Sequence, residues 1–185
     1  MPILTVKNLV NDRILHKPSK KVKDFNSTEI LILIQEMRRI AIEPNVVGIA
    51  APQLGKHYRV FALCTNLIPQ PVFFFNPVLK GVSEEMKEVT EGCLSVPGKV
   101  MSLERYAKVT LAWQDERCRK YSKDNKPYEF DFEGFEGQAV QHEMNHIDGI
   151  LCSDIAKATF NASDFEESFA KAKAAEEAEA LAIEG

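Results

Sequence analysis

The spacing of apolar residues predicts two helices that pack against a core. Apolar positions recur every three or four residues over 27–42, which is the period of an amphipathic helix. Asn26 is expected to cap this helix and Pro44 to end it. A second helix is predicted from about 133 to 148, with Gly149 in the place of a C-terminal cap.

Shorter apolar or alternating runs between the helices predict β-strands. These runs are Tyr58–Cys64, Val72–Phe75, Val78–Val82, Lys108–Trp113 and Tyr128–Phe132. Pro77 separates the second run from the third, because proline interrupts strand pairing. The predicted fold class is therefore α+β, with mixed, mainly antiparallel strands around the second helix.

Composition adds the expectation of one globular domain with a polar tail. The 185 residues are 45% hydrophobic and 27% charged, and a chain of this length buries a real core. We expect residues 1–160 to form the domain and residues 161–185, rich in Ala and Glu, to form a C-terminal helical tail. No signal peptide or membrane-spanning apolar run is apparent, so we expect a cytoplasmic protein with no membrane partner. Nothing in the sequence demands a dimer, so a monomer is expected.

The second predicted helix carries the pattern His-Glu-x-x-His. On a helix, His142 and His146 project one turn apart from one face, where two imidazoles can bind one divalent metal ion. Glu143 can then act as a base for a water molecule on that metal. Two histidines also fall four residues apart by chance on some core helices, so the rest of the chain must decide.

A catalytic site of this kind needs a third protein ligand. Cys93 is one candidate, and the neighbouring Glu91 is placed to orient an imidazole. Cys152 is a second candidate because it stands where longer metalloprotease patterns have a third histidine, although an apolar run around it also fits a core thiol. Glu166 or Glu167 is a third candidate, although both lie in an acidic segment. The residues favour Cys93 and leave the others open.

Three stretches resemble, in order, the three signature motifs of the peptide deformylase family. They are Gly48-Ile49-Ala50-Ala51-Pro52-Gln53, Glu91-Gly92-Cys93-Leu94-Ser95 and Gln141-His142-Glu143-Met144-Asn145-His146. The resemblance covers roughly residues 1–155. It implies a metallo-hydrolase that removes the formyl group from the N-terminal formyl-methionine of newly synthesised proteins and releases formate. It also implies a catalytic Fe²⁺, which Zn²⁺, Ni²⁺ or Co²⁺ commonly replaces.

The same resemblance assigns roles to individual residues. The implied metal ligands are Cys93, His142 and His146. Glu143 would be the catalytic acid and base, while Gln53 and the backbone N–H of Leu94 would bind the formyl oxygen.

The substrate would lie along the first two motifs. Gly48 would offer backbone contacts to the peptide, which we expect to add as an extended strand beside Gly92. Val47, Leu94 and Ala139 are expected to line the pocket for the methionine side chain.

The chain departs from the family pattern at two positions. Val46 replaces a usual glycine, and its side chain either narrows the substrate groove or faces solvent. Asn145 replaces a usual aspartate, which would pair with an arginine, and Arg105 is the candidate partner. Together with Glu91, Asn145 and Arg105 would support the metal ligands from the side away from the metal. We expect a modest loss of stability from Asn145 and retained activity.

Other functions remain possible at this level. A zincin-type endopeptidase would use Cys152 or Glu166 as its third ligand, and a degenerate homologue would bind metal or peptide without turnover. An enzyme for nascent formyl-methionyl peptides is also expected to contact the ribosome transiently. The acidic tail lacks clustered lysine and arginine, so we expect it not to bind nucleic acid strongly.

Overall fold

The computed structural model describes residues 1–114 and 127–167. The helices of this part are α1 (Leu9–Leu15), α2 (Thr28–Ala41), α4 (Gly134–Asp148) and α5 (Cys152–Ile155), with a 3₁₀ helix η1 (Ala51–Leu54). The strands are β1 (Gly48–Ala50), β2 (Val60–Leu63), β3 (Val72–Val82), β4 (Met86–Gly92), β5 (Lys99–Tyr106), β6 (Lys108–Gln114), β7 (Tyr128–Glu133) and β8 (Ala158–Asn161).

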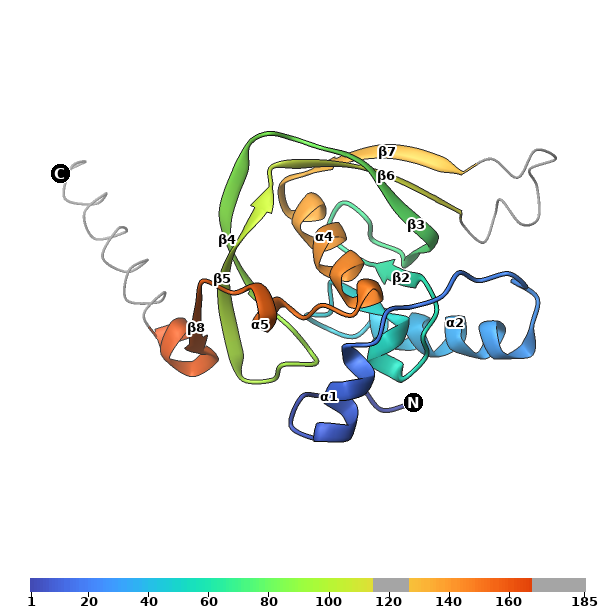
Figure 1. Cartoon of the computed structure of the whole chain (residues 1–185), viewed down its shortest axis with the longest axis horizontal. Helices are drawn as coiled ribbons and strands as arrows, with labels where there is room; N and C mark the ends of the chain where they lie inside the picture. Colours follow the sequence, from blue (N-terminus) through green and yellow to red (C-terminus); the bar gives the residue numbers. More distant parts are fainter. Residues whose placement is uncertain (115–126, 168–185) are drawn as a thin grey trace.

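The strands form two antiparallel sheets that surround α4 (Figure 1). The larger sheet has the order β1-β2-β3-β6-β7, and the smaller one has the order β4-β5-β8. α4 contacts strands of both sheets as well as η1. α2 packs against β1 and β2. The predicted α+β class with mainly antiparallel strands is confirmed.

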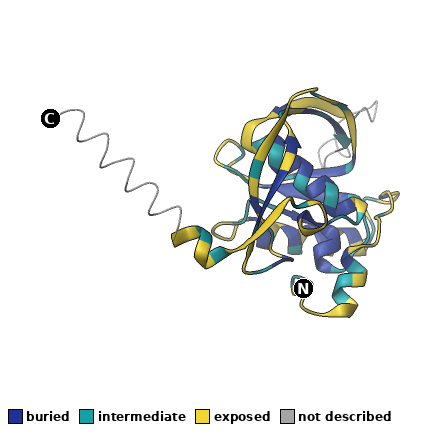
Figure 2. Cartoon of the chain, turned by 60° about the vertical axis from the view of Figure 1, so that its left-hand side comes forward, coloured by how far each residue is buried: buried dark blue, intermediate teal, exposed yellow. Residues whose placement is uncertain are grey.

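Three clusters of buried side chains make up the core, whose dark centre is visible in Figure 2. The first joins α2 to β1, β2 and β3. The second joins the apolar stripe of α4, formed by Val140, Met144 and Ile147, to the larger sheet. The third lies between α1, β5 and α5, and includes Leu15, Met101, Leu103 and Cys152. The two faces of α4 therefore differ, since one is packed into the core and the other carries the polar motif.

β3 corrects the prediction of two separate strands. It runs through Pro77 with a register shift between Phe75 and Val78 against β6. Asn76 has a positive φ of 49°, and its side-chain amide exchanges hydrogen bonds with the backbone of Val22. Pro77 is tolerated because it lies at this irregularity, where the regular pairing of β3 with β6 is already interrupted.

Two predicted helix ends can be compared with the structure. The N-cap of α2 is Ser27, one residue later than the expected Asn26, and it makes no side-chain capping bond. Gly149 ends α4 with a φ of 77°, as predicted. A Cβ there would also lie 2.7 Å from the His16 carbonyl oxygen, so glycine is required twice over. Residues 162–167 are helical, and the remainder of the predicted tail, 168–185, lies outside the described residues.

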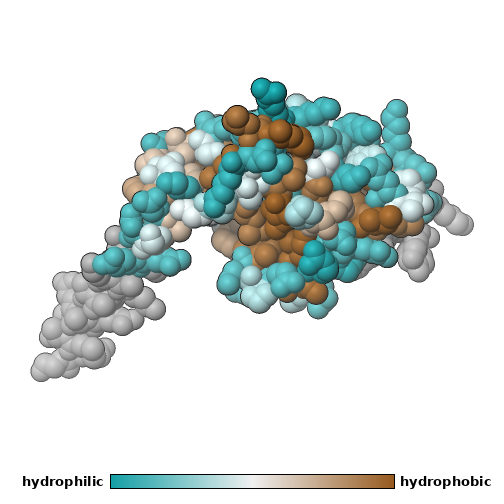
Figure 3. All heavy atoms as spheres, turned by 90° about the horizontal axis from the view of Figure 1, so that it is seen from below, coloured by the Kyte–Doolittle hydropathy of each residue, from teal (hydrophilic) through white to brown (hydrophobic). Residues whose placement is uncertain are grey.

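Apolar residues gather in a band on the face seen from below (Figure 3). On α1, Leu9 is 81% exposed and Val10 is 65% exposed. Within residues 1–114 and 127–167, no helix combines the length and apolar character needed to cross a bilayer.

Candidate active site

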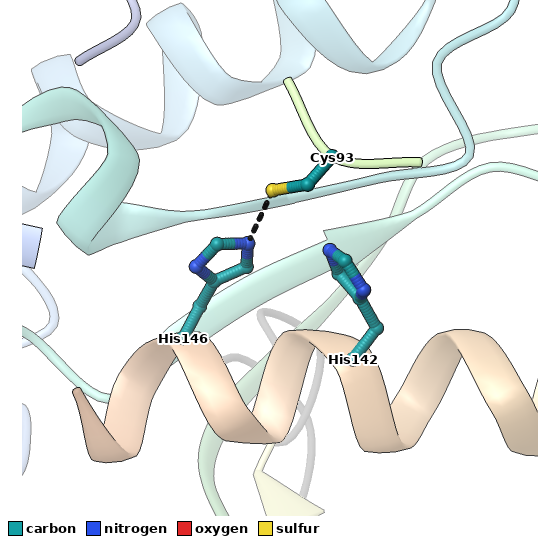
Figure 4. Close-up of side chains that lie close together, drawn as sticks. All are labelled: Cys93, His142 and His146. Carbon is teal, nitrogen blue, oxygen red and sulfur yellow. Dashed lines mark hydrogen bonds between the residues drawn. The ribbon is translucent and has the colours of Figure 1, made fainter. Parts of the chain in front are cut away.

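Two histidines of α4 and one cysteine from the smaller sheet meet at the centre of the molecule. Figure 4 shows His142 and His146 rising from successive turns of α4 toward Cys93, which directly follows β4. Cys93 Sγ lies 3.3 Å from His146 Nε2. One ligand atom from each of the three side chains lies within 4.8 Å of the others.

The donor set fits a divalent metal ion. Sulfur and imidazole nitrogen on one tetrahedral ion lie about 3.5 Å apart, close to the separation of Cys93 from His146. His142 donates its Nδ1–H to Glu91 Oε2 at 2.8 Å, so its Nε2 is left for the metal. A thiolate with two imidazoles suits Fe²⁺ or Zn²⁺ better than Mg²⁺.

A buried ion pair supports the histidines from behind. Arg105 donates through Nε and Nη2 to the two oxygens of Glu91, each at 2.8 Å, and through Nη1 to Asn145 Oδ1. Arg105 and Glu91 are both buried. One guanidinium therefore fixes Glu91 on β4 and Asn145 on α4 relative to each other.

This network sets the charge of its members. Burial alone would raise the pKa of Glu91, but hydrogen bonds from Arg105 and His142 outweigh it and lower the pKa to about 2. Burial opposes a charge on His142, yet the hydrogen bond to Glu91 and the charge of Glu143 raise its pKa. Glu91 is therefore a permanent carboxylate that holds the imidazole of His142 in place.

Glu143 lies against β1 with a carboxylate that is poised to exchange a proton. Its side chain is buried, and burial raises its pKa to about 7. Among the described residues, its Oε2 has no hydrogen-bond partner. A Cβ on Gly48 would lie 2.4 Å from its Oε1, so glycine at this position makes room for the carboxylate.

Gln53 of η1 and Leu94 of the segment after β4 lie in the same region. Gln53 accepts a hydrogen bond from the Ala50 N–H at 2.8 Å, which fixes its amide oxygen. Its Nε2 donates a hydrogen bond to Ser95 Oγ at 3.3 Å. Leu94 is 38% exposed and lines the same cavity. Ser95 is the last residue of the second motif, but the sequence analysis gave it no role of its own.

A cavity of about 490 Å³ opens over these residues, a size typical of small-ligand sites. Of the residues expected to touch substrate, it is lined by Val47, Gly48, Gly92, Leu94 and Ala139. Val46 also lines it, so this departure from the family pattern faces the cavity.

The sequence did not point to several other lining residues. These are Asn45, Thr90, Pro97, Gly98, Phe135 and Gln138. Gln138 Nε2 donates to the Thr90 carbonyl at 3.1 Å and so joins α4 to β4 at the cavity wall. Phe135 is 55% exposed at the start of α4. Only the three-dimensional arrangement brings these polar and aromatic residues to the site.

A second group of possible ligands overlaps the first. Atoms of Glu91, His142 and Cys152 also lie within 4.8 Å of one another. The carboxylate of Glu91 is already bound by Arg105 through both oxygens, and Cys152 is not among the described residues that line the cavity. This group therefore fits an open catalytic site less well than Cys93 with the two histidines.

Two imidazoles, a thiol and a buried glutamate at one cavity are typical of metal-dependent hydrolases. The polypeptide deformylase family model matches residues 3–161. The chain belongs to this family of hydrolases, which remove the N-formyl group from newly made proteins.

Individual relatives agree with this assignment. The chain is 32% identical over 148 residues to peptide deformylase 1 of Nostoc sp., covering 78% of this chain and 75% of that protein. A peptide deformylase from Synechococcus elongatus in complex with actinonin superposes with a TM-score of 0.72 at 26% identity, covering 92% of this chain and 85% of that one. A Met-Ala-Ser-bound peptide deformylase from Acinetobacter baumannii gives 0.70 at 29% identity, covering 84% and 97%.

Proposed function

We propose that this chain hydrolyses the N-formyl group of formyl-methionyl peptides with a metal ion held by Cys93, His142 and His146. Fe²⁺ is the expected native metal, and Zn²⁺, Ni²⁺ or Co²⁺ can replace it. The observation that carries the proposal is the convergence of these three ligand atoms with the Glu143 carboxylate at one cavity. The family match and the bound ligands named for the related structures support it.

The reaction transfers a proton from water to the leaving amine and forms an oxyanion at the formyl carbon on the way. When bound, the metal polarises the formyl carbonyl and lowers the pKa of a water molecule. Glu143 takes the proton of the attacking water, whose oxygen bonds to the formyl carbon. Gln53 Nε2 and the Leu94 N–H donate to the developing oxyanion, a contribution of about 3 kcal/mol per donor. Glu143 then passes the proton to the departing amine as the C–N bond breaks and formate leaves.

The edges of both sheets provide a place for the peptide. β1 is one of the two edge strands of the larger sheet, and β4 is one of the two edge strands of the smaller one. Gly48 and Gly92, from these two strands, line the cavity. An extended peptide can pair with such an edge through its main chain, which tolerates many sequences after methionine. Val47, Leu94 and Ala139 would contact the methionine side chain.

Formate release from formyl-Met-Ala-Ser tests the proposal directly. Protein purified without oxygen and loaded with Fe²⁺ should release formate, and Cys93→Ala should lose both metal and activity. Cys152→Ala is the matched control, because it removes a second thiol from the cluster against which Cys93 packs. If Cys93→Ala keeps its metal and Cys152→Ala does not, the ligand set is wrong and an endopeptidase site becomes the better explanation.

The finer cellular setting is part of the same proposal. We propose a cytoplasmic monomer that meets nascent chains through transient ribosome contact, without strong RNA binding by the acidic tail. The charge of residues 161–185 supports the last point, since RNA phosphates attract clustered lysine and arginine. Ribosome co-sedimentation that is salt-sensitive and disappears on deletion of residues 170–185 would contradict it.

A further inference from the structure

The thiol of Cys152 lies in the same buried region as the thiol of Cys93. Cys93 packs against the cluster between α1, β5 and α5 that contains Cys152, and each of the two sulfurs lies within 4.8 Å of a ring nitrogen of His142. They come from distant parts of the chain, since Cys93 follows β4 and Cys152 is the first residue of α5. A disulfide requires two thiols that can meet with little movement of the backbone.

The two thiols differ in their access to solvent. Cys93 lines the cavity, so a small oxidant that enters there reaches its sulfur. Cys152 is 2% exposed and, within the described part of the chain, does not line the cavity. The arrangement gives an order of reaction, with Cys93 oxidised first and Cys152 positioned to attack it.

We propose that Cys93 and Cys152 form a reversible disulfide when a hydroperoxide oxidises the site. The effect on the metal rests on the proposed role of Cys93 as a ligand, whereas disulfide formation itself does not.

The chemistry balances with hydrogen peroxide as the only added reactant. The Cys93 sulfur attacks one peroxide oxygen, the O–O bond breaks, and a sulfenic acid and one water form. The Cys152 sulfur then attacks the Cys93 sulfur, the S–O bond breaks, and a second water leaves with the Cys152 proton. Two electrons pass from the two thiols to the peroxide. A dithiol reverses the change by thiol–disulfide exchange.

The local structure allows the small movement that the bond requires. The two sulfurs must approach to about 2 Å, and the movement is shared between the two side chains. Both residues lie at ends of elements, Cys93 after β4 and Cys152 at the start of α5, and neither is held inside a long helix or strand. A short displacement there leaves the pairing of β4 with β5 intact.

The disulfide would change the fate of the metal centre. It removes the thiolate, so the metal loses one of its three protein ligands and is released. It also consumes the sulfenic acid before further peroxide converts it to sulfinic acid, which small thiols do not reduce. With Cys152 present, peroxide would therefore cause a reversible loss of activity instead of irreversible oxidation of Cys93.

Peptide mapping after peroxide treatment tests the proposal. Full-length protein is loaded with Ni²⁺, which avoids the radical chemistry of Fe²⁺ with peroxide, and then receives a near-stoichiometric amount of hydrogen peroxide. We expect a cross-linked peptide containing Cys93 and Cys152 under non-reducing conditions, about 2 Da lighter than the two thiol peptides. Ni²⁺ release should parallel this cross-link. Dithiothreitol with fresh Ni²⁺ should restore most of the formate release.

Variants separate the role of Cys152 from general oxidation. Cys64→Ser should behave as the parent, because Cys64 packs in a different core cluster. Cys152→Ser and Cys152→Ala should instead gain sulfinic acid at Cys93 and recover about tenfold less of their own starting activity. The proposal is wrong if the parent accumulates sulfinic acid at Cys93 as the variants do, or if Cys93 pairs with another cysteine. A parent that never releases formate refutes the proposed function instead, while the cross-link is still measured.

Discussion

Replacing Gly48 with alanine should displace the carboxylate of Glu143, the proposed acid and base. The added Cβ would lie 2.4 Å from Glu143 Oε1, 2.8 Å from its Cδ and 3.0 Å from its Cγ. Ordinary contact begins at 3.4 Å, so the carboxylate must shift by about 1 Å. Glu143 is only 4% exposed and lines the cavity, so the shift is taken up inside the site. A misplacement of about 1 Å costs about 100-fold in rate, or about 2.7 kcal/mol.

The assay is kcat/KM for formate release by Fe²⁺-loaded protein, with metal content and melting temperature measured on the same sample. Gly92→Ala is the matched control, since it adds a methyl group to the same cavity but meets nothing within 4 Å. Adding Gly48→Ala to Glu143→Gln should cost no further activity, because the acid and base is already absent. The reasoning fails if Gly48→Ala stays within about threefold of the parent, or if Gly92→Ala loses as much.

Three further changes probe the surroundings of the site. Asn145→Asp should raise the free energy of unfolding by about 1 kcal/mol, because a carboxylate then faces Arg105. The melting temperature should rise by about 2–4 °C, and a lower melting temperature would contradict this. Glu91→Gln should weaken metal affinity about 10–100-fold in competition with a chromophoric chelator, and unchanged affinity would rule out its supporting role. For His16, burial opposes the charge, but hydrogen bonds to a backbone carbonyl and to Asp154 raise its pKa above 6.5. The stability that His16→Gln removes should therefore be larger at about pH 5.5 than at about pH 8.5 in urea unfolding, and an equal loss at both would refute it.

Local periodicity was sufficient to predict the long helices. The apolar positions of α2 repeat at the helical period, and its observed bounds, Thr28–Ala41, agree with the prediction to within one residue at each end. α4 begins and ends close to the predicted residues. α1 was not predicted, because its seven residues are too few for a clear period and only Leu15 is buried.

The smaller sheet was missed for a different reason. β4 buries only Glu91 among exposed side chains, so it shows no alternation of apolar and polar residues. β5 buries Ser102 and Arg105 beside its apolar residues, and both appear polar and therefore exposed in the sequence. Polar groups are buried here because the site needs them, which hides the strand from a hydrophobic pattern.

The contacts of the site also differ in how well the sequence predicts them. The spacing of His142 and His146 fixes their proximity through helix geometry alone, so the sequence predicts it well. The approach of Cys93 and Cys152 depends on how the smaller sheet and α5 dock on α4, and no local pattern encodes that docking. The proximity of the two thiols therefore became visible only in the structure.

The distance along the chain between the side chains of the site has a consequence for folding. The contact of Cys93 with His146 closes a loop of 53 positions, and that of Glu91 with His142 closes one of 51. Closing loops of this length is entropically costly, so such contacts form late unless other packing has already brought the ends together. A metal ion can bind here only after the two sheets have assembled on α4. Metal uptake then marks the last stage of folding. A chain that is still being synthesised would acquire its metal only after residue 146 has left the ribosome.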